Sequence, residues 1–556
     1  MKLQTEVLII GGGATGAGIA RDLSLRGISC ILVEKGDFAG GASGRNQGLL
    51  HSGSRYAVND PEAARECITE NMILRRIAPH CLEETGGLFV SLPEDGLEFQ
   101  RKFIAGCQAA GIEAIRISPE EALALEPNLN RRLLGAVRVP DGAVDPFTLV
   151  IENIRDAESR GARFFSHTEV TDLIVRDNWV KGVKAKGRID QEEYLISASY
   201  VVNATGAWAN HILRMAGLSI PMAMSKGTMI ITNRRISQRI INRCRPPADG
   251  DIIVPNDTVS ILGTTSIRSH DADLYEATAE EVSFLIGALS ELMPILKETR
   301  LTRAYAGIRP LLQTGAGEGD RSISRGFSLL DHGKRDGMHN LITITGGKLI
   351  TYRLMAEKVA NHLCESLGVA VGCTTHSTPL PGAGSPHGLQ ERLSSSVRPS
   401  SRSGAEVICE CELVGREELE TVLKKEPLKD LQDILHRTRL AKGTCQGGFC
   451  VYRMIGVLHR LNLAPADSNA ILRGFLEERW KGSWPVLWGA SLREGELIET
   501  IYKELFNLDD FVKSPDADLG ARASRPQGQA CGVFRGHVPI PSGFRNKPPP
   551  PTPHSS

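Results

Sequence analysis

The stretch "TEVLIIGGGATGAGIARDLSLRG" (residues 5–27) decides the fold expected for the first part of this chain. The apolar run VLII predicts a short buried strand, and the residues after the glycines have the periodicity of a helix. Between them, Gly11, Gly13 and Gly16 complete the pattern G-x-G-x-x-G. Glycines at such a turn let backbone N–H groups approach a pyrophosphate at the helix N-terminus. The stretch therefore predicts a dinucleotide-binding unit.

A second predicted strand, "SCILVEK", supports this interpretation because it ends in an acid, Glu34, 18 residues after Gly16. A carboxylate at this place binds ribose hydroxyls and disfavours a 2′-phosphate, so NADP is not expected. Three later glycine-containing stretches, at residues 40–56, 200–208 and 340–357, are expected to contact the same ligand. Three such contacts suit a long FAD better than NAD. We expect the cofactor to contact Gly11, Gly13, Thr15, Gly16, Glu34, Ser43, Ala204, Gly206, Gly346 and Gly347.

Length and charge limit the number of domains and the kinds of partner that are expected. The chain has 556 residues, which is too long for one core and predicts several domains. Lys and Arg number 65, as do Asp and Glu, so the net charge is zero and broad nucleic-acid binding is not expected. No apolar run reaches the roughly 18–20 residues of a membrane-spanning helix. We expect a cytoplasmic protein, with a peripheral membrane role left open.

Five motifs give the chain a resemblance to the glycerol-3-phosphate dehydrogenase branch of the FAD-dependent oxidoreductases. The resemblance implies an α/β fold: a Rossmann-like FAD-binding domain with an inserted α+β substrate domain, arranged as in D-amino-acid oxidase. It also implies oxidation of sn-glycerol 3-phosphate to dihydroxyacetone phosphate, with a hydride passing to FAD. The motifs are "HSGSRY" (51–56), "VNATGAW" (202–208), "LGTTS" (262–266), "AGIRPL" (306–311) and "TGGKLITYR" (345–353).

The resemblance also implies a set of substrate residues. Arg309 and Arg325 match positions that contact the substrate phosphate, for which a planar guanidinium is well suited. Lys348 is placed beside the flavin or substrate, where a cation would stabilise the negative charge of the reduced flavin. We expect Arg309, Arg325 and Lys348 to act in catalysis, with Arg55, Tyr56 and Thr265, next to Thr264, as further substrate contacts.

The general base is not evident from the sequence. Aerobic members of the family have a histidine after "KGS", whereas this chain has "SKGTMII" with Met229 at that position. A methionine cannot accept a proton, so the base lies elsewhere or the electrostatics of the pocket promote deprotonation. His51 is the nearest motif histidine, and it either acts as the base or packs along the flavin.

Four cysteines late in the chain form two close pairs, in "ICEC" (408–411) and "GTCQGGFC" (443–450). Thiolate pairs bind zinc or iron–sulfur clusters, and zinc sites favour two to four residues between paired ligands. The segment resembles the [2Fe–2S] domain of the bacterioferritin-associated ferredoxin type, except that its second pair has four intervening residues instead of two. A [2Fe–2S] cluster, zinc, and an empty or disulfide-bonded site all stay open for Cys409, Cys411, Cys445 and Cys450.

The cysteine pairs relate the chain to the anaerobic branch of its family. That resemblance implies electron transfer from FAD through the cluster to partner subunits and a membrane quinone, with FMN admissible in the assembled complex. The chain would then lie on the inner face of the cell membrane through its partners. Two alternatives stay open: an amine or imino-acid dehydrogenase of the same fold, and a non-catalytic FAD-binding electron-transfer scaffold.

Composition shifts predict the domain boundaries. Ser, Pro and Gly dominate after residue 370 and again after residue 512, which is typical of linkers and disordered tails. Two helices are expected between the cysteine pairs, at residues 416–424 and 428–438. The expected parts are an oxidoreductase at 1–370 (dinucleotide core 1–85, 150–215 and 335–370; substrate domain 86–149 and 216–334), a linker at 371–405, a small helical cysteine domain at 406–460, a helical segment at 461–512, and a disordered tail at 513–556.

Overall fold

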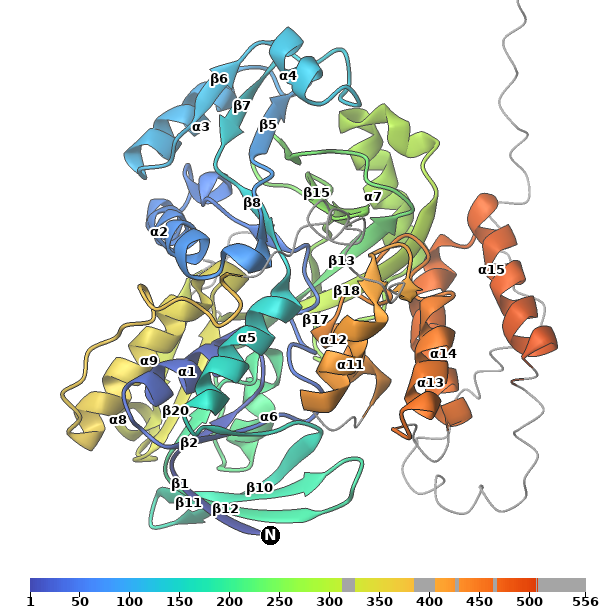
Figure 1. The fold of residues 1–556 in the computed structure, drawn as a ribbon. Coiled ribbons are helices and arrows are strands. Elements are labelled where there is room, and N and C mark those ends of the chain that lie inside the picture. The colour runs from blue at the N-terminus through green and yellow to red at the C-terminus, as the bar shows by residue number, and fades with distance from the viewer. Residues whose placement is uncertain (313–325, 385–405, 426–429, 464–467, 507, 509–556) are drawn as a thin grey trace, which may run out of the picture. The chain divides into compact units, whose positions relative to one another are not determined.

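The computed structural model describes residues 1–312, 326–384, 406–425, 430–463, 468–506 and 508 (Figure 1). Its contacts divide the chain into two compact units, Met1–Thr500 and Ile501–Ser556. In the second unit, Ile501–Leu505 form a π-helical turn. Most of the expected linker and the whole expected tail lie outside the described residues. No described helix has both the length and the apolar character needed to cross a membrane.

The first sheet of the larger unit is the dinucleotide-binding sheet. Its strands run in the order β10-β11-β12-β1-β2-β9, with β20 beside β12 and β19 beside β20. The pairs β1–β2, β1–β12 and β12–β20 are parallel, so the carboxyl ends of these strands meet at one edge. The strands are β1 (Lys2–Ile10), β2 (Cys30–Val33), β9 (Arg163–Phe165), β10 (Thr168–Arg176), β11 (Trp179–Gly187), β12 (Glu193–Asn203), β19 (Phe327–Asp331) and β20 (Leu341–Gly346).

Helices cover this sheet because its central strands are buried on both faces, as parallel strands usually are. Residues Val7 to Ile10 are all buried. The helix α1 (Ala14–Leu25) packs between α5 (Pro146–Ser159) and α9 (Tyr352–Leu367), as Figure 1 shows. Gly18 makes this close approach feasible, since a Cβ there would lie 2.9 Å from the Tyr352 ring. The shorter helices are α6 (Ala209–Arg214) and α8 (His332–Asp336).

The second sheet takes its strands from residues 87–139 and 222–312 and runs in the order β17-β13-β16-β15-β14-β5-β7-β6, with β18 beside β13. β13 and β18 form a long antiparallel pair, and their successive side chains point to opposite faces of the sheet. The elements are β5 (Gly87–Ser91), β6 (Ile115–Ile117), β7 (Gly135–Val139), β13 (Met222–Thr232), β14 (Ile240–Arg243), β15 (Ile252–Asn256), β16 (Val259–Gly263), β17 (Ile267–Ser269), β18 (Leu301–Leu312), α2 (Pro61–Ile77), α3 (Glu98–Ala109), α4 (Pro119–Leu125) and α7 (Ala279–Leu292). A separate small sheet of β3 (Leu49–Leu50), β8 (Gly142–Val144) and β4 (Leu82–Glu83) packs against β14 and β15.

The cysteine region is a hairpin followed by helices. The expected helix at 416–424 is found as α11 (Arg416–Lys425), and the one expected at 428–438 is found as α12 (Leu431–Arg437). Asp430 caps α12, and its capping box with Asp433 explains where the helix begins. The other elements are β21 (Val407–Cys409), β22 (Val414–Gly415), α13 (Cys450–Arg460), α14 (Ser468–Ser483) and α15 (Ala490–Thr500).

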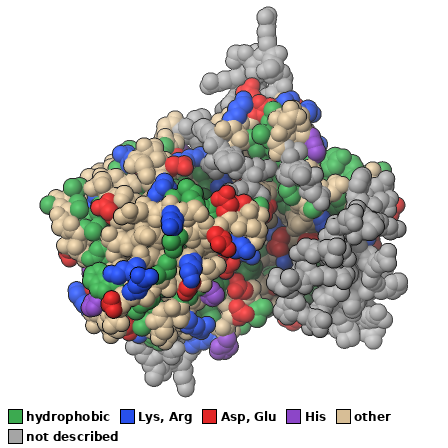
Figure 2. Space-filling model, turned by 90° about the horizontal axis from the view of Figure 1, so that it is seen from below, with side chains coloured by type: hydrophobic (Ala, Val, Ile, Leu, Met, Phe, Trp, Pro, Cys, Tyr) green, Lys and Arg blue, Asp and Glu red, His purple; other side chains and the backbone are tan. Residues whose placement is uncertain are grey.

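Basic and acidic side chains are mixed on the face of the molecule drawn in Figure 2. On the face drawn in Figure 2, Lys and Arg lie among Asp and Glu without a large area of one sign. This mixture agrees with the zero net charge of the sequence.

Candidate functional site

A cavity of about 2040 Å³ opens at the carboxyl ends of β1, β2 and β12 and continues along β18 of the second sheet. Ligands of doubly wound folds bind at such an edge because the strand ends and helix N-termini converge there. Gly11 and Glu34 line one part of the cavity, and Arg309 and Lys348 line another. The cavity therefore joins the predicted cofactor residues to the predicted substrate residues.

The glycine-rich turn leaves no room for side chains. Gly11 has a φ of +112°, and a Cβ on it would lie 2.6 Å from the carbonyl oxygen of Ala204. A Cβ on Gly16 would overlap the carbonyl oxygen of Gly11. Gly13 stands at the N-cap of α1, where the backbone N–H groups are free of intrahelical partners. The turn thus brings the backbone of Gly11 and Gly13 to the wall of the cavity.

Glu34 lies at the end of β2 and is held by the same turn. Its carboxylate accepts hydrogen bonds from the N–H of Gly12 at 2.7 Å and the N–H of Gly36 at 2.9 Å. Burial raises the pKa of the Glu34 carboxyl. Each carboxylate oxygen has a second lone pair that a ribose hydroxyl could use. Ser43 supports the turn through its Oγ, which accepts from the Ala14 N–H at 2.9 Å.

The remaining predicted cofactor residues line the cavity, whereas Gly16 is not among its lining residues. Thr15 follows the turn, and its hydroxyl lies 3.8 Å from the sulfur of Met355. Gly206, Gly346 and Gly347 all have positive φ, which glycine adopts without strain. The lining residues from these later stretches are Ala204, Gly206, Gly346 and Gly347.

His51, Tyr56 and Lys348 meet at the other part of the cavity. The rings of His51 and Tyr56 stack with centroids 5.0 Å apart, and Lys348 Nζ lies 4.9 Å from the Tyr56 centroid. Burial, together with the charges of Lys348 and Arg55, lowers the pKa of His51 to about 3. Its Nδ1 accepts from the Gly53 N–H at 2.8 Å, so the neutral ring carries its proton on Nε2. In this arrangement His51 is a hydrogen-bond donor and has no free lone pair with which to act as a base.

Arg309 enters the cavity from β18. Its Nη2 donates to the Thr264 hydroxyl, and both Nη atoms lie 3.2 Å from the Thr265 carbonyl oxygen. The neighbouring strand has Gly227 there, because a Cβ would clash with the guanidinium. Thr264 lines the cavity. The Thr265 hydroxyl instead accepts from the Thr228 N–H at 3.0 Å, inside the substrate domain.

Of two further predicted substrate residues, Arg55 and Arg325, the structure describes only the first. Arg55 lines the cavity, and its Nη2 donates to Asp251 Oδ2 at 3.1 Å and to the Ala248 carbonyl at 3.0 Å. Arg325 lies outside the described residues. Met229, at the place of the family histidine, is buried and pairs with Tyr305 across the sheet.

The cavity fits a long ligand with a polar end and a flat end. Two buried side-chain atoms at the cavity, His51 Nε2 and Thr345 Oγ1, have no hydrogen-bond partner among the described residues. Buried polar atoms usually have partners, so these mark places where a ligand supplies them. The glycine turn and Glu34 suit the pyrophosphate and ribose of a dinucleotide, and the flat end suits an isoalloxazine ring.

The four cysteines lie together. The thiol of Cys409 hydrogen bonds with those of Cys411 and Cys450, and Cys411 also bonds with Cys445. These bonds lower the pKa of Cys411 and Cys450 and raise the pKa of Cys409 and Cys445. The Thr444 hydroxyl is 3.1 Å from Cys411 Sγ, and all four thiols are free. Such a group of sulfur ligands can hold a soft metal centre.

A buried arginine connects these cysteines to the cavity wall. Arg439 Nε lies 2.6 Å from Glu412 Oε2, next to Cys411 in the sequence. The same guanidinium donates to Asp145 at 3.1 Å and to Asn256 at 2.9 Å. The Glu412 carboxylate also accepts from the Thr258 hydroxyl at 2.6 Å, which ties the cysteine region to the hairpin of β15 and β16.

Comparison with known proteins decides the family. Residues 6–353 match the model of the FAD-dependent oxidoreductases. One component of the anaerobic glycerol-3-phosphate dehydrogenase of Escherichia coli K12 is 46% identical over 527 residues, which cover 91% of this chain and 97% of that protein. The chain belongs to this oxidoreductase family. A component of the anaerobic glycerol-3-phosphate dehydrogenase of Haloferax volcanii is 43% identical, with 93% of both chains covered.

Solved structures show the same fold for this FAD-dependent oxidoreductase. Glycerol-3-phosphate dehydrogenase of Bacillus halodurans, solved with FAD, superposes with a TM-score of 0.55 at 23% identity, covering 90% of this chain and 95% of that one. Glycine oxidase of Geobacillus kaustophilus gives a TM-score of 0.53 at 23% identity, with 68% and 98% covered. The predicted α/β fold and the dependence on FAD are confirmed.

Of the two neighbouring threonines expected near the substrate, Thr264 lines the cavity and Thr265 does not, because neighbouring residues beyond a strand end point in different directions. Sequence reasoning missed Thr345 and Arg439 of the oxidoreductase's cavity. Thr345 directly precedes the predicted Gly346 and Gly347. Its place within "TGG" was a signal that could have identified it. Helical periodicity predicted α12, but no local pattern indicated that α12 or Arg439 would line the cavity, because their partners are far away in the sequence.

Proposed function

We propose that this chain is the catalytic subunit of an FAD-dependent sn-glycerol-3-phosphate dehydrogenase and that it forms dihydroxyacetone phosphate. The observation that carries the proposal is that three cations, Arg55, Arg309 and Lys348, line the same cavity as His51 and Tyr56. A phosphate dianion needs such fixed positive charge, and arginine binds it with two parallel hydrogen bonds. The names of the relatives specify the same phosphorylated alcohol.

Each side chain has a role in this proposal. Arg309 binds the phosphate, and Thr264 and the Thr265 carbonyl keep its guanidinium in place. Arg55 adds positive charge but is already paired with Asp251, so its share of phosphate binding is smaller. Arg325 is proposed as a second phosphate ligand on the resemblance alone. Bound FAD supplies the hydride acceptor.

Proton transfer is proposed to depend on Lys348 and His51. The ammonium of Lys348 is buried beside Tyr56, where its charge favours an alkoxide over the alcohol. His51 donates from Nε2 and orients a substrate or flavin oxygen. Its tautomer supports this role over that of a base.

We also propose a [2Fe–2S] cluster bound by Cys409, Cys411, Cys445 and Cys450. A tetrahedral zinc with bonds of about 2.3 Å would hold all four sulfurs about 3.8 Å apart. Among the described residues, no three of these sulfurs all lie within 4.8 Å of one another. Two metal ions with two sulfurs each suit the extended arrangement better than one ion. Partner subunits, a membrane quinone as acceptor, and FMN in the assembled complex belong to the same proposal.

An anaerobic titration of the purified chain with sn-glycerol 3-phosphate tests the function. We expect the flavin absorbance band to bleach, with iron and acid-labile sulfide present in equal amounts. Bleaching by free amino acids but not by glycerol 3-phosphate would support an amine or imino-acid dehydrogenase. A flavin that no substrate reduces would support the scaffold alternative. Zinc in place of iron would contradict the cluster and leave the dehydrogenase proposal intact.

A further inference from the structure

One wall of the FAD cavity comes from the cysteine region and not from the FAD-binding sheet. The helix α12 and the residue before it contribute Asp430, Leu431, Gln432, Leu435 and His436 to the lining. Nothing in the G-x-G-x-x-G pattern requires this helix, because the turn and its acid complete a dinucleotide site by themselves.

This wall lies at the adenosine end of the cavity. Glu34 marks the ribose position, and the Thr168 N–H donates to the Glu34 carbonyl at 2.8 Å. The His167 N–H donates to the Gly36 carbonyl, also at 2.8 Å. Asp37 and His167 are therefore fixed next to the ribose-binding acid, and both contact α12.

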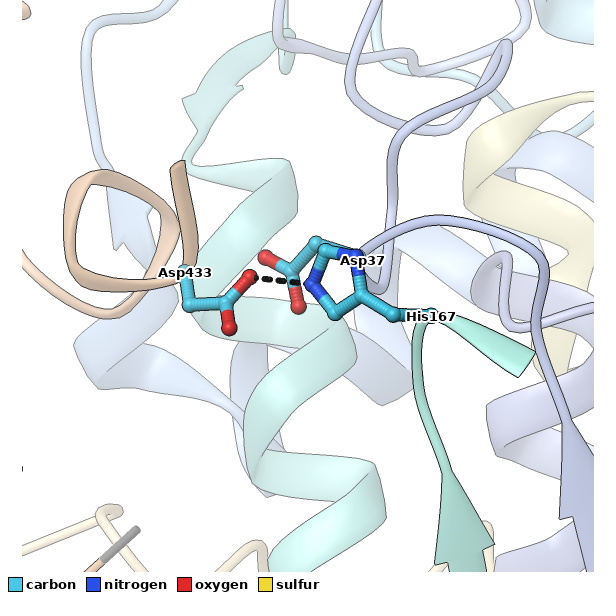
Figure 3. A group of neighbouring side chains, drawn as sticks. All are labelled: Asp37, His167 and Asp433. Carbon is cyan, nitrogen blue, oxygen red and sulfur yellow. Dashed lines mark hydrogen bonds and ion pairs between the residues drawn. The ribbon is translucent and has the colours of Figure 1, made fainter. Parts of the chain in front are cut away.

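Buried polar contacts hold α12 at this place (Figure 3). His167 Nε2 lies 2.7 Å from Asp433 Oδ1, the bond drawn as a dashed line in the figure. Asp37 Oδ2 lies 2.6 Å from His436 Nδ1, and Arg437 Nη1 donates to both oxygens of Asp37 at 3.0–3.1 Å. The side chains of Asp37 and Arg437 are only 3% and 5% exposed. We call this group of five residues the α12 clasp.

Ring contacts reinforce the α12 clasp. His436 stacks on Phe147 at 4.4 Å with an interplanar angle of 14°. The Arg437 guanidinium lies 5.9 Å from the Phe38 ring, and that ring packs against Gly12 of the glycine turn. The clasp is thus joined to the cofactor turn by direct packing.

A metal ion is a weaker explanation of the same group. Ligand atoms of Asp37, His167 and Asp433 do lie within 4.8 Å of one another. However, Asp37 already binds the guanidinium of Arg437, and a divalent cation beside that charge would be repelled. The contacts observed satisfy both carboxylates without an ion.

We propose that α12 closes the adenosine end of the FAD site, so that FAD is exchanged only when α12 undocks. Docking of the cysteine region and binding of FAD are then linked, and each strengthens the other by the same factor. The cysteine region has a role in cofactor retention besides any metal that it binds. Breaking the clasp leaves buried charges unpaired, which is strongly destabilising for the docked state.

The test measures the rate of FAD release from the full-length holoprotein, followed by the rise in flavin fluorescence after dilution. We expect Arg437→Ala and Asp433→Asn each to speed release by at least about tenfold, because each breaks the buried clasp. Arg416→Ala is the matched control, since Arg416 lies in the same region but pairs with Glu420 and Glu406, away from the cavity. Equal acceleration in the control, or unchanged release in both clasp variants, overturns the proposal.

Hydrogen exchange of the wild-type protein gives a second measurement that needs no substitution. Linkage requires that bound FAD slow the exchange of the α12 amides, relative to the same protein freed of FAD. The helix α3, outside the cavity, provides the internal reference. Equal exchange of α12 with and without FAD would show that the helix is not part of the cofactor site.

Discussion

The glycine turn of residues 11–16 and the α12 clasp both contact the FAD cavity, yet the chain builds them differently. In the turn, the residues that line the cavity lie next to one another in the chain, and the restriction on each glycine is steric. In the clasp, the His167–Asp433 and Asp37–Arg437 pairs join residues 266 and 400 positions apart. A local feature leaves a pattern in the sequence, whereas a feature made by docking does not. The comparison teaches that a motif can identify a cofactor without revealing what encloses it.

The largest effect is expected from the turn itself. Gly16→Val would drive its side chain into the Gly11 carbonyl, so FAD affinity should fall by more than about a hundredfold as overpacking displaces the turn. Flavin absorbance per chain after purification measures the loss. Gly287→Ala in α7, where a Cβ meets nothing within 4 Å, should retain full FAD content. Normal FAD content in Gly16→Val would show that the turn is not the site.

Removal of one thiol tests the cysteine region, to which α12 belongs. Cys411→Ser should abolish bound iron, because Cys411 is central in the chain of contacts among the four sulfurs. FAD content should stay near that of the wild type, since no cysteine of the group lines the cavity. Iron analysis and the flavin spectrum measure both in one sample. Cys373→Ser, outside the group, should keep its iron, and iron retained in Cys411→Ser would contradict the assignment.

Substitution of Arg309 should affect catalysis and leave FAD in place. Arg309→Ala should lower kcat/KM for glycerol 3-phosphate by about 10²- to 10³-fold, the range expected when charge-assisted hydrogen bonds to a phosphate are lost. Steady-state kinetics with an artificial electron acceptor measure the change. Exposed Arg138→Ala is the control. An equal loss of FAD from Arg309→Ala would mean that this residue belongs to the cofactor site.

The smallest effect is expected from a change of pH, which should alter the rate of FAD release through His167. The hydrogen bond to Asp433 and the charges of Asp433, Asp37 and Asp430 raise the pKa of His167 against the opposing effect of burial. Protonated His167 therefore stabilises the docked state below about pH 6.5, its ordinary pKa. That contribution is lost as pH rises through the raised pKa, while Arg437 and His436 still hold Asp37. FAD release should quicken a few-fold between pH 6 and pH 9, and His167→Asn should flatten the profile.

Much of the fold and the cofactor wall could be predicted because it follows from local rules. Gly11, Gly16 and Glu34 obey the geometry of a strand, a turn and a second strand, and α11 follows from helical periodicity. The tautomer of His51 could not be predicted, since it depends on the N–H of Gly53 in the folded turn. The clasp could not be predicted either, because Asp37 and Arg437 become neighbours only when the two regions dock.

The separation of 400 residues between Asp37 and Arg437 has a consequence for biosynthesis. A ribosome adding roughly 5–20 residues per second needs about 20–80 seconds to make this intervening chain. Throughout that interval the glycine turn and Glu34 exist without α12 over them. Gly346 and Gly347 of the cavity wall are also made before α12, so FAD can load in the period before α12 emerges and closes the site as proposed above.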